Sequence, residues 1–266
     1  MSQIKTIHSV YFSPTGNSRI AARAVAYALK RELGAEYNEL DLTPAAARRA
    51  EHTFDNDDIV VIAMPVYAGR LPNKIAPDIA ANISGSGKTR LIALCTYGKR
   101  SPGSALRELL ILGRQNGFVP LAARSIECEH AFSAKIARGR PNGADLAELD
   151  KLGAGLARSI AAGQDKPLDF DYESPLAPYY TPLKEDSTPA RFLKAKPVVD
   201  LSLCTRCAKC AAVCPMGSIR ANNPAETDGV CIKCQACIKV CPAGARRFED
   251  ADFISHVRML EKSFGE

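Results

Sequence analysis

The sequence predicts an α/β fold: a doubly wound five-stranded parallel sheet, followed by a small α+β module that is rich in cysteine. Short apolar runs alternate with amphipathic helical stretches over residues 1–163. Prolines then crowd residues 164–197, and eight of the ten cysteines fall between Cys204 and Cys241. Strands that alternate with helices are typical of a parallel sheet. A chain of 266 residues is long enough to bury the core of such a sheet.

The five strands are expected at runs of apolar residues. Ile59–Val66 and Arg90–Thr96 are continuous apolar runs, which is typical of central parallel strands covered on both faces. Tyr37–Leu42 alternates between apolar and polar residues and predicts a half-buried strand. The outer strands are expected at Ile7–Phe12 and Val119–Ile126. The helices of this domain are expected at Ser18–Glu32, Ala105–Asn116 and Asp145–Ala162.

Residues 164–197 are expected to form an extended connector. Proline removes a backbone donor and fixes φ, so regular helices and strands are disfavoured where it is dense. The six prolines are Pro167, Pro175, Pro178, Pro182, Pro189 and Pro197. Tyr179 and Tyr180 indicate that the connector lies on a surface. The cysteine module is expected over residues 198–248, and a terminal helix, Asp250–Phe264, within residues 249–266.

The cysteine module contains an internal repeat. LCTRCAKCAAVCP, from Leu203, and VCIKCQACIKVCP, from Val230, match in every cysteine and in the final proline. Both copies have the spacing C-x2-C-x2-C-x3-C-P. Zinc is the alternative, but zinc sites use well-separated pairs of C-x2-C and do not explain a third cysteine followed by C-P. The repeat resembles the bacterial-type two-cluster ferredoxins, which implies two [4Fe–4S] clusters.

The resemblance also implies which cysteines bind each cluster. In two-cluster ferredoxins the fourth cysteine of a motif binds the cluster of the other motif. The ligands are then expected to be Cys204, Cys207, Cys210 and Cys241 for cluster 1, and Cys231, Cys234, Cys237 and Cys214 for cluster 2. Pro215 and Pro242 are expected to end the two ligand loops.

A polar turn follows the first expected strand. Its residues are Ser13, Pro14, Thr15, Gly16, Asn17 and Ser18. Such a turn offers hydroxyls, backbone N–H groups and a helix N-terminus to an anion. The alternative is that Ser18 or Asn17 only caps the helix. The turn resembles the phosphate loop of flavodoxins, S/T-x-T-G-x-S/T, which implies a bound FMN.

Two further strand ends are expected to complete this FMN site. Their residues are Pro65, Val66, Tyr67, Ala68 and Gly69 after the third strand, and Thr96, Tyr97 and Gly98 after the fourth. A tyrosine near a glycine suits stacking on a flavin ring and close approach of the backbone. Arg70, Lys99 and Arg100 add positive charge beside the expected flavin, which favours its anionic reduced form.

The whole chain resembles the flavodoxin–ferredoxin fusion proteins of anaerobic microbes. The flavodoxin resemblance covers residues 4–163 and the ferredoxin resemblance covers residues 198–248. It implies electron transfer with other redox proteins, such as a ferredoxin or a reductase. The alternative is an enzyme in which the clusters feed FMN to reduce a small substrate, with His130, Arg70 and Tyr97 as candidate catalytic residues beside Tyr67. A redox-sensing regulator is a third class, but no DNA-binding feature supports it.

Several weaker signals are expected to be structural. Gly85–Thr89 imitates a nucleotide-binding loop, but Asn82 stands where its first glycine belongs, so a turn is expected. Cys95 is expected in the core. Cys128 follows the fifth strand and so lies within reach of the flavin, although nearby glutamates would make its thiol less reactive. Residues 132–143 are basic and contain glycine and proline, and we consider them as a lid over the flavin.

Charge and hydropathy limit the partners and the location. The formal net charge is +6, but the lysines and arginines are spread along the chain, so no nucleic-acid partner is expected. Steering of an acidic redox partner is the alternative use of this charge. No apolar run reaches the roughly 18 residues that span a bilayer, and Met1–Val10 has no export-signal pattern. A cytoplasmic protein is expected, and a dimer is one possible oligomeric state.

Overall fold

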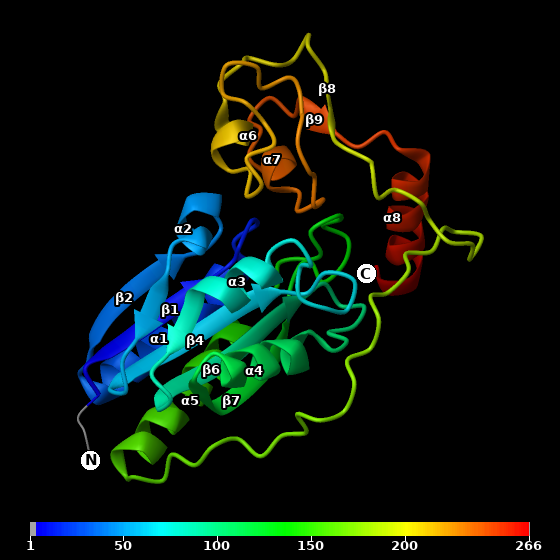
Figure 1. Ribbon diagram of the computed structural model, residues 1–266. Helices are drawn as coiled ribbons and strands as arrows, with labels where there is room; N and C mark the ends of the chain where they lie inside the picture. The colour runs from blue at the N-terminus through cyan, green and yellow to red at the C-terminus, as the bar shows by residue number, and fades with distance from the viewer. Residues whose placement is uncertain (1–3, 266) are drawn as a thin grey trace.

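Five parallel strands form the main sheet of the computed structural model, which describes residues 4–265 (Figure 1). The strands are β1 (Thr6–Tyr11), β2 (Glu36–Asp41), β4 (Asp58–Pro65), β6 (Thr89–Tyr97) and β7 (Phe118–Glu127), in the order β2-β1-β4-β6-β7. Counted along the chain, this order is 2-1-3-4-5, which is that of flavodoxin-like folds. The predicted sheet is therefore confirmed, and β4 and β6 are buried along most of their length.

Helices cover both faces of this sheet. The predicted helices are confirmed as α1 (Asn17–Leu33), α4 (Ala105–Gln115) and α5 (Gly143–Ala161). Apolar residues of α1 and α5 share one core cluster, and those of α4 and the short α3 (Ala76–Asn82) share the cluster on the opposite face. A Cβ added at Gly153 of α5 would lie 2.6 Å from the carbonyl oxygen of Val25 in α1. Only glycine permits this close approach of the two helices.

Four short elements of the sheet domain are missing from the sequence analysis. They are α2 (Ala45–Arg49), β3 (His52–Phe54), α3, and β5 (Ile83–Gly85), which pairs in parallel with β3. The seven residues of α3 have a proline in the first turn and one buried side chain, Ile79, so they carry too little periodicity to predict a helix. The expected turn lies between β5 and β6, where the chain bends through Gly87 and Lys88.

The connector runs over the surface of the sheet domain as an extended segment, as predicted (Figure 1). The hydroxyl of Tyr179 donates to the carbonyl oxygen of Leu71 (2.9 Å), and the N–H of Tyr180 donates to that of Ala68 (2.8 Å). The guanidinium of Arg100 stacks over the ring of Tyr180 at 3.7 Å. The two tyrosines therefore fasten the connector beside the loop that follows β4.

The cysteine module is small and irregular. It contains α6 (Lys209–Ala212), α7 (Ala236–Lys239) and an antiparallel pair, β8 (Val198–Val199) with β9 (Arg246–Arg247). The predicted terminal helix is α8 (Ala251–Phe264), capped by the Asp250 carboxylate, which accepts the N–H of Phe253. The division of the chain at residues 163, 197 and 248 stays a prediction. Of the helices within residues 4–265, none is long and apolar enough to cross a membrane.

Candidate functional site: two cysteine cavities beside a loop-lined cleft

The eight cysteines of the repeat line two small cavities. One cavity, here called cluster site 1, is lined by Cys204, Cys207, Cys210 and Cys241. The other, cluster site 2, is lined by Cys214, Cys231, Cys234 and Cys237. The structure therefore brings together the same two sets of four that the ferredoxin resemblance implies, with the fourth cysteine of each motif in the cavity of the other.

The two motif loops have the same unusual backbone. Arg206 and Lys233, which are equivalent in the repeat, have φ values of 54° and 57°, and Ala208 and Gln235 have values of 56° and 67°. Residues other than glycine rarely adopt positive φ, and such a backbone is found mainly at functional sites, where the surrounding structure imposes it. The N–H groups of such loops turn toward their concave side.

Backbone donors meet the cysteine sulfurs in both loops. The N–H of Ser218 donates to the Cys214 sulfur (3.4 Å), and the backbone N–H groups of Lys209, Lys233 and Ala236 favour the thiolate forms of Cys207, Cys231 and Cys234, respectively. Four cysteines surrounded by N–H donors are a donor set that fits a [4Fe–4S] cluster. Within residues 4–265, no three His, Cys, Asp or Glu side chains are arranged to hold a single metal ion.

A cleft of about 250 Å³ opens where β1, β4 and β6 end. All of the predicted FMN-binding residues except Gly16 and Gly69 line this cleft. The lining residues are Ser13, Pro14, Thr15, Asn17, Ser18, Pro65, Val66, Tyr67, Ala68, Thr96, Tyr97 and Gly98. Gly16 and Gly69 lie in the same turns with φ values of 96° and 77°, and so shape the backbone. The place of the cleft is the one where ligands bind in open α/β sheets.

The turn after β1 presents donors to the cleft. Helix α1 begins at Asn17 with Gly16 as its N-cap, so the alternative in which Asn17 or Ser18 caps the helix is wrong. Helix geometry leaves the N–H groups of Asn17 and Ser18 without an acceptor in their own helix. The hydroxyl of Ser18 is hydrogen-bonded to that of Thr96 (2.8 Å), which joins this turn to the end of β6. Free N–H groups at a helix N-terminus suit the phosphate of FMN.

Tyr67 and Tyr97 lie on the loops that follow β4 and β6. The N–H of Val66 donates to the carbonyl oxygen of Thr96 (2.8 Å), so the two loops are joined. Burial raises the pKa of both tyrosines, and for Tyr67 the charges of Cys234 and Cys231 raise it further. Both tyrosines line the cleft and are neutral at pH 7.

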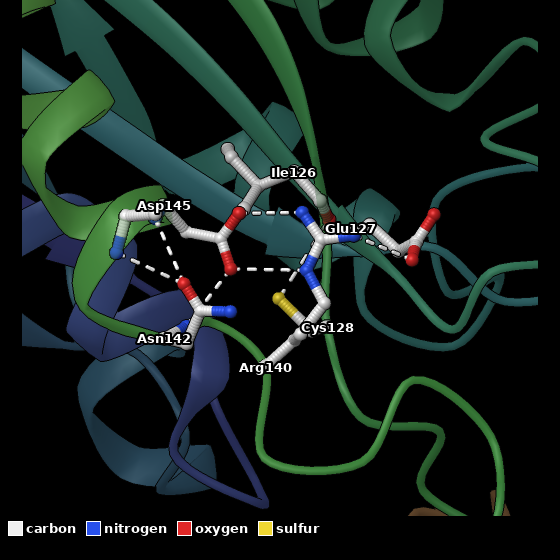
Figure 2. A network of polar contacts seen from close by, with 7 residues as sticks. Ile126, Glu127, Cys128, Arg140, Asn142 and Asp145 are labelled. Atoms are coloured by element: carbon white, nitrogen blue, oxygen red, sulfur yellow. Dashed lines mark hydrogen bonds and ion pairs between the residues drawn. The ribbon is translucent and has the colours of Figure 1, made fainter. Parts of the chain in front are cut away.

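A network at the end of β7 fixes the loop that enters the cleft (Figure 2). Arg140 donates to the carboxylates of Glu127 (2.6 Å) and Asp145 (3.0 Å), and Asn142 caps α5 through its side-chain oxygen. Phe132 is the residue of the predicted lid, 132–143, that lines the cleft. Ser133 and Lys135 bind Glu261 of α8. This segment is therefore tied down and contributes a wall to the cleft.

His130 lies on the same loop and is one of the candidate catalytic residues. Its Nδ1 accepts the N–H of Phe132 (3.1 Å), which leaves the proton of the neutral ring on Nε2. Burial, together with the charges of His256, Lys239 and Arg100, lowers the pKa of His130 to about 4. A Cβ at Gly98 would lie 2.3 Å from the His130 ring, so the glycine at this position makes room for the imidazole. His130 is a neutral donor at pH 7.

Arg70 does not line the cleft, in contrast to the expectation from sequence. Its guanidinium pairs with both oxygens of Glu108 (2.8 and 2.9 Å) and donates to the carbonyl oxygen of Ala177. Glu108 follows 38 residues later in the chain, so sequence alone did not indicate the pair. Arg70 therefore braces the connector, while Arg100 lines the cleft.

The two other cysteines have buried thiols. Cys95 lies in the core, as expected, and burial raises its pKa. Cys128 lines the cleft, but burial raises its pKa to about 12, so the thiol is protonated at neutral pH. Neither is therefore a candidate nucleophile.

Residues from outside the sheet domain close the cleft, and the sequence analysis missed them. They are Tyr180, Pro182 and Phe192 of the connector, Ile232 and Lys233 of cluster site 2, and His256 and Leu260 of α8. The pair of tyrosines in the connector was the one sequence signal that pointed to this contact. The cleft is thus enclosed by three regions that are far apart in the chain.

Comparison with known protein families identifies the cysteine module. Residues 196–242 match the family described as 4Fe-4S dicluster domain. The chain joins a flavodoxin-like domain to a C-terminal 4Fe–4S dicluster domain. The flavodoxin-like domain is assigned from its strand order, and the dicluster domain contains all eight repeated cysteines. Together the two domains indicate a role in redox electron transfer.

The flavodoxin-like domain is similar to solved flavodoxins at low identity. An archaeal flavodoxin is 15% identical, with 59% of this chain and 99% of that chain covered and a TM-score of 0.37. A Streptococcus pneumoniae flavodoxin is 18% identical, with 59% and 99% covered and a TM-score of 0.39. A short-chain flavodoxin associated with a bacterial microcompartment is 18% identical, with 58% and 98% covered and a TM-score of 0.40. No curated protein matches the chain.

Proposed function

We propose that this chain transfers electrons between redox proteins through two [4Fe–4S] clusters and an FMN held in the cleft. One observation carries the proposal: Ile232 and Lys233 line both the cleft and cluster site 2. Within the described residues, no residue that lines cluster site 1 also lines the cleft. This adjacency supports a relay in which cluster site 2 lies between the cleft and cluster site 1.

Different residues of the cleft would bind the phosphate and the ring of FMN. Ser13, Thr15 and the N–H groups of the first turn of α1 would bind the phosphate. Tyr67 and Tyr97 would contact the flavin ring, and Arg100 would place positive charge near it. A bound FMN supplies one- and two-electron chemistry.

Apolar side chains from three segments line the cleft. Phe132, Phe192 and Leu260 come from the β7 loop, the connector and α8, respectively. Phe132 and Phe192 both pack against Phe253 of α8, with ring centroids 4.9 and 5.3 Å apart. Such apolar walls would limit the contact of a bound flavin with solvent, which favours electron exchange through the cluster domain.

A second function is favoured by the polar groups in the same cleft. Arg100 and His130 line it from two different segments, and both carry N–H donors. Such a set suits a small anionic substrate beside the flavin. In this alternative the chain is a reductase in which the clusters feed FMN, and His130 donates a hydrogen bond to the substrate.

An anaerobic titration of the full chain, reconstituted with iron, sulfide and FMN, tests these functions. Reduced low-potential ferredoxin, NADH and NADPH are added in turn, and flavin and cluster absorbance are followed separately. Fast bleaching of both chromophores by ferredoxin, with no reaction of the nicotinamides, is the expected result. Reduction of the flavin by a nicotinamide within catalytic times would contradict the carrier and favour the reductase. A chain that takes up clusters but no FMN would overturn the flavin part of the proposal.

A further inference from the structure

Arg246 is a buried arginine on the wall of cluster site 1. It is 3% exposed, and its guanidinium donates to the Cys210 sulfur (3.5 Å), to the carbonyl oxygen of Pro224, and to the hydroxyl of Thr227 (2.7 Å). Its Nε has no hydrogen-bond partner among the described residues. None of these three partners is a carboxylate. Since a buried charge is costly unless a charge of opposite sign compensates it, a negative group is required at this cavity.

The internal repeat gives Arg246 a counterpart in cluster site 2. The sequence after the fourth cysteine is CPAGAR in one copy, ending at Arg246, and CPMGSI in the other, ending at Ile219. Ile219 is also buried, at 6% exposure, and it lines cluster site 2 as Arg246 lines cluster site 1. At the same position of the repeat, one site therefore has a cation and the other an aliphatic side chain.

We propose that Arg246 raises the reduction potential of cluster 1 above that of cluster 2, so that the first electron to enter the dicluster domain rests on cluster 1. Reduction adds one electron to a cluster that is already bound by four thiolates. A guanidinium that donates to one of these sulfurs stabilises the added negative charge more than it stabilises the oxidised cluster. Ile219 offers cluster 2 neither a charge nor a donor.

The inference gives a direction to the proposed relay, and it rests on the binding of both clusters in that proposal. Cluster site 2 shares Ile232 and Lys233 with the cleft, whereas Cys207 of cluster site 1 is exposed to solvent. Transfer from cluster 2 to cluster 1 is then energetically downhill, from the cleft toward the surface. An electron that enters from the cleft side is held at the cluster that an external protein can reach.

The direct bond of Arg246 is to a sulfur of cluster site 1, and Arg246 does not line cluster site 2. Because coulombic interactions in a protein interior extend beyond contact distance, removal of the charge is expected to lower both potentials. The potential of cluster 1 is expected to fall further, because it also loses the N–H donor to Cys210.

Voltammetry of the full reconstituted chain tests the inference through the separation of the two cluster waves. In the unaltered protein two resolved one-electron waves are expected. In Arg246→Gln the separation narrows, and the preference of the first electron for cluster 1 falls by about tenfold, the size expected for one hydrogen bond to a charged group. Arg247→Gln is the matched control, because Arg247 is exposed and pairs with Asp200 and Glu249. It removes the same charge one residue away and is expected to leave the separation unchanged.

Three results would overturn the inference: a single unresolved wave in the unaltered protein, an unchanged or wider separation in Arg246→Gln, or an equal narrowing in Arg247→Gln. If Arg246→Gln does not assemble both clusters, Arg246→Lys decides instead. This variant keeps the charge but not the forked donor, so a partial narrowing is expected and an unchanged separation contradicts the inference. A chain that binds no clusters at all would instead overturn the proposed function, and iron content distinguishes that result.

Discussion

The two cluster sites have the same ligand motif but different surroundings. Cys207 and Cys234 occupy equivalent positions of the repeat, yet Cys207 is exposed and Cys234 is 9% exposed. The N–H of Lys209 lowers the pKa of the Cys207 thiol, whereas burial raises the pKa of Cys234 to about 12. The motif and its positive-φ backbone therefore determine the ligand geometry, and the environment of each site comes from elsewhere in the fold.

The difference arises where the dicluster domain meets the flavodoxin-like domain. Met216 and Ile232, which flank cluster site 2, pack against the core cluster on the α3 and α4 face of the sheet. Arg48 of α2 is fully buried and contacts the Met216 sulfur at 3.8 Å. Cluster site 1 has no such cover at Cys207. Two copies of one sequence motif thus become an inner site and an outer site because only one of them is docked.

The largest effect is expected from removal of a ligand at the inner site. In Cys234→Ala, reduced ferredoxin should still reduce cluster 1, but the flavin should stay oxidised because the site that adjoins the cleft is lost. In Cys207→Ala, the repeat-equivalent change, the flavin should still exchange electrons with cluster 2. Stopped-flow absorbance measures the reduction of the flavin and of the clusters in both variants, with iron content as the control for the remaining cluster. Flavin reduction at the original rate in Cys234→Ala would show that electrons do not reach the flavin through cluster site 2.

Much of this comparison was accessible from sequence, because the repeat and the strand pattern are local signals. The apolar run Arg90–Thr96 lies in β6, and the run Ile59–Val66 lies in β4 except for Val66. The ferredoxin resemblance implied the sets of cysteines that line the two cavities. The contacts that distinguish the two sites were not accessible. Ile232 carries no periodic or motif signal for a contact with the cleft, since its role depends on how the domains dock.

The contacts of long charged side chains were the least accessible from sequence. Arg70 follows a glycine at a strand end, where a ligand contact is expected. In the structure its guanidinium donates instead to both carboxylate oxygens of Glu108. Arg246 is one of two adjacent arginines in the sequence, and nothing in that pair indicates that one is buried and the other exposed. Local pattern determines elements and motif loops, whereas the partner of a long side chain depends on the completed tertiary structure.

A smaller effect is expected from pH at the cleft side. The pKa of His130 in the folded protein is about 4, below the value near 6.5 of an unfolded histidine, so protons bind preferentially to the unfolded chain. The free energy of unfolding that depends on a neutral His130 is fully present at pH 7 and above and is lost as the pH falls toward 4. At pH 5 the loss is about 2 kcal/mol. Denaturant unfolding of the original protein and of His130→Asn at pH 7 and pH 5 measures it, since asparagine keeps an acceptor for the Phe132 N–H. Equal pH dependence in both proteins would contradict this assignment.

The smallest effect is expected from the ion pair that joins the dicluster domain to the cleft loop. Lys239 of α7 lies 3.3 Å from the carboxylate of Glu129, and the repeat-equivalent position near cluster site 1 is Ala212, so only the inner site has this contact. Because both side chains are partly exposed, Lys239→Met should cost less than about 1 kcal/mol. The loss should shrink further at high salt. Lys151→Met, which breaks an exposed pair with Glu148 inside α5, is the matched control in denaturant unfolding. A cost well above that of the control, and independent of salt, would mean that the docked interface depends on this pair and not on the apolar contacts of Met216 and Ile232.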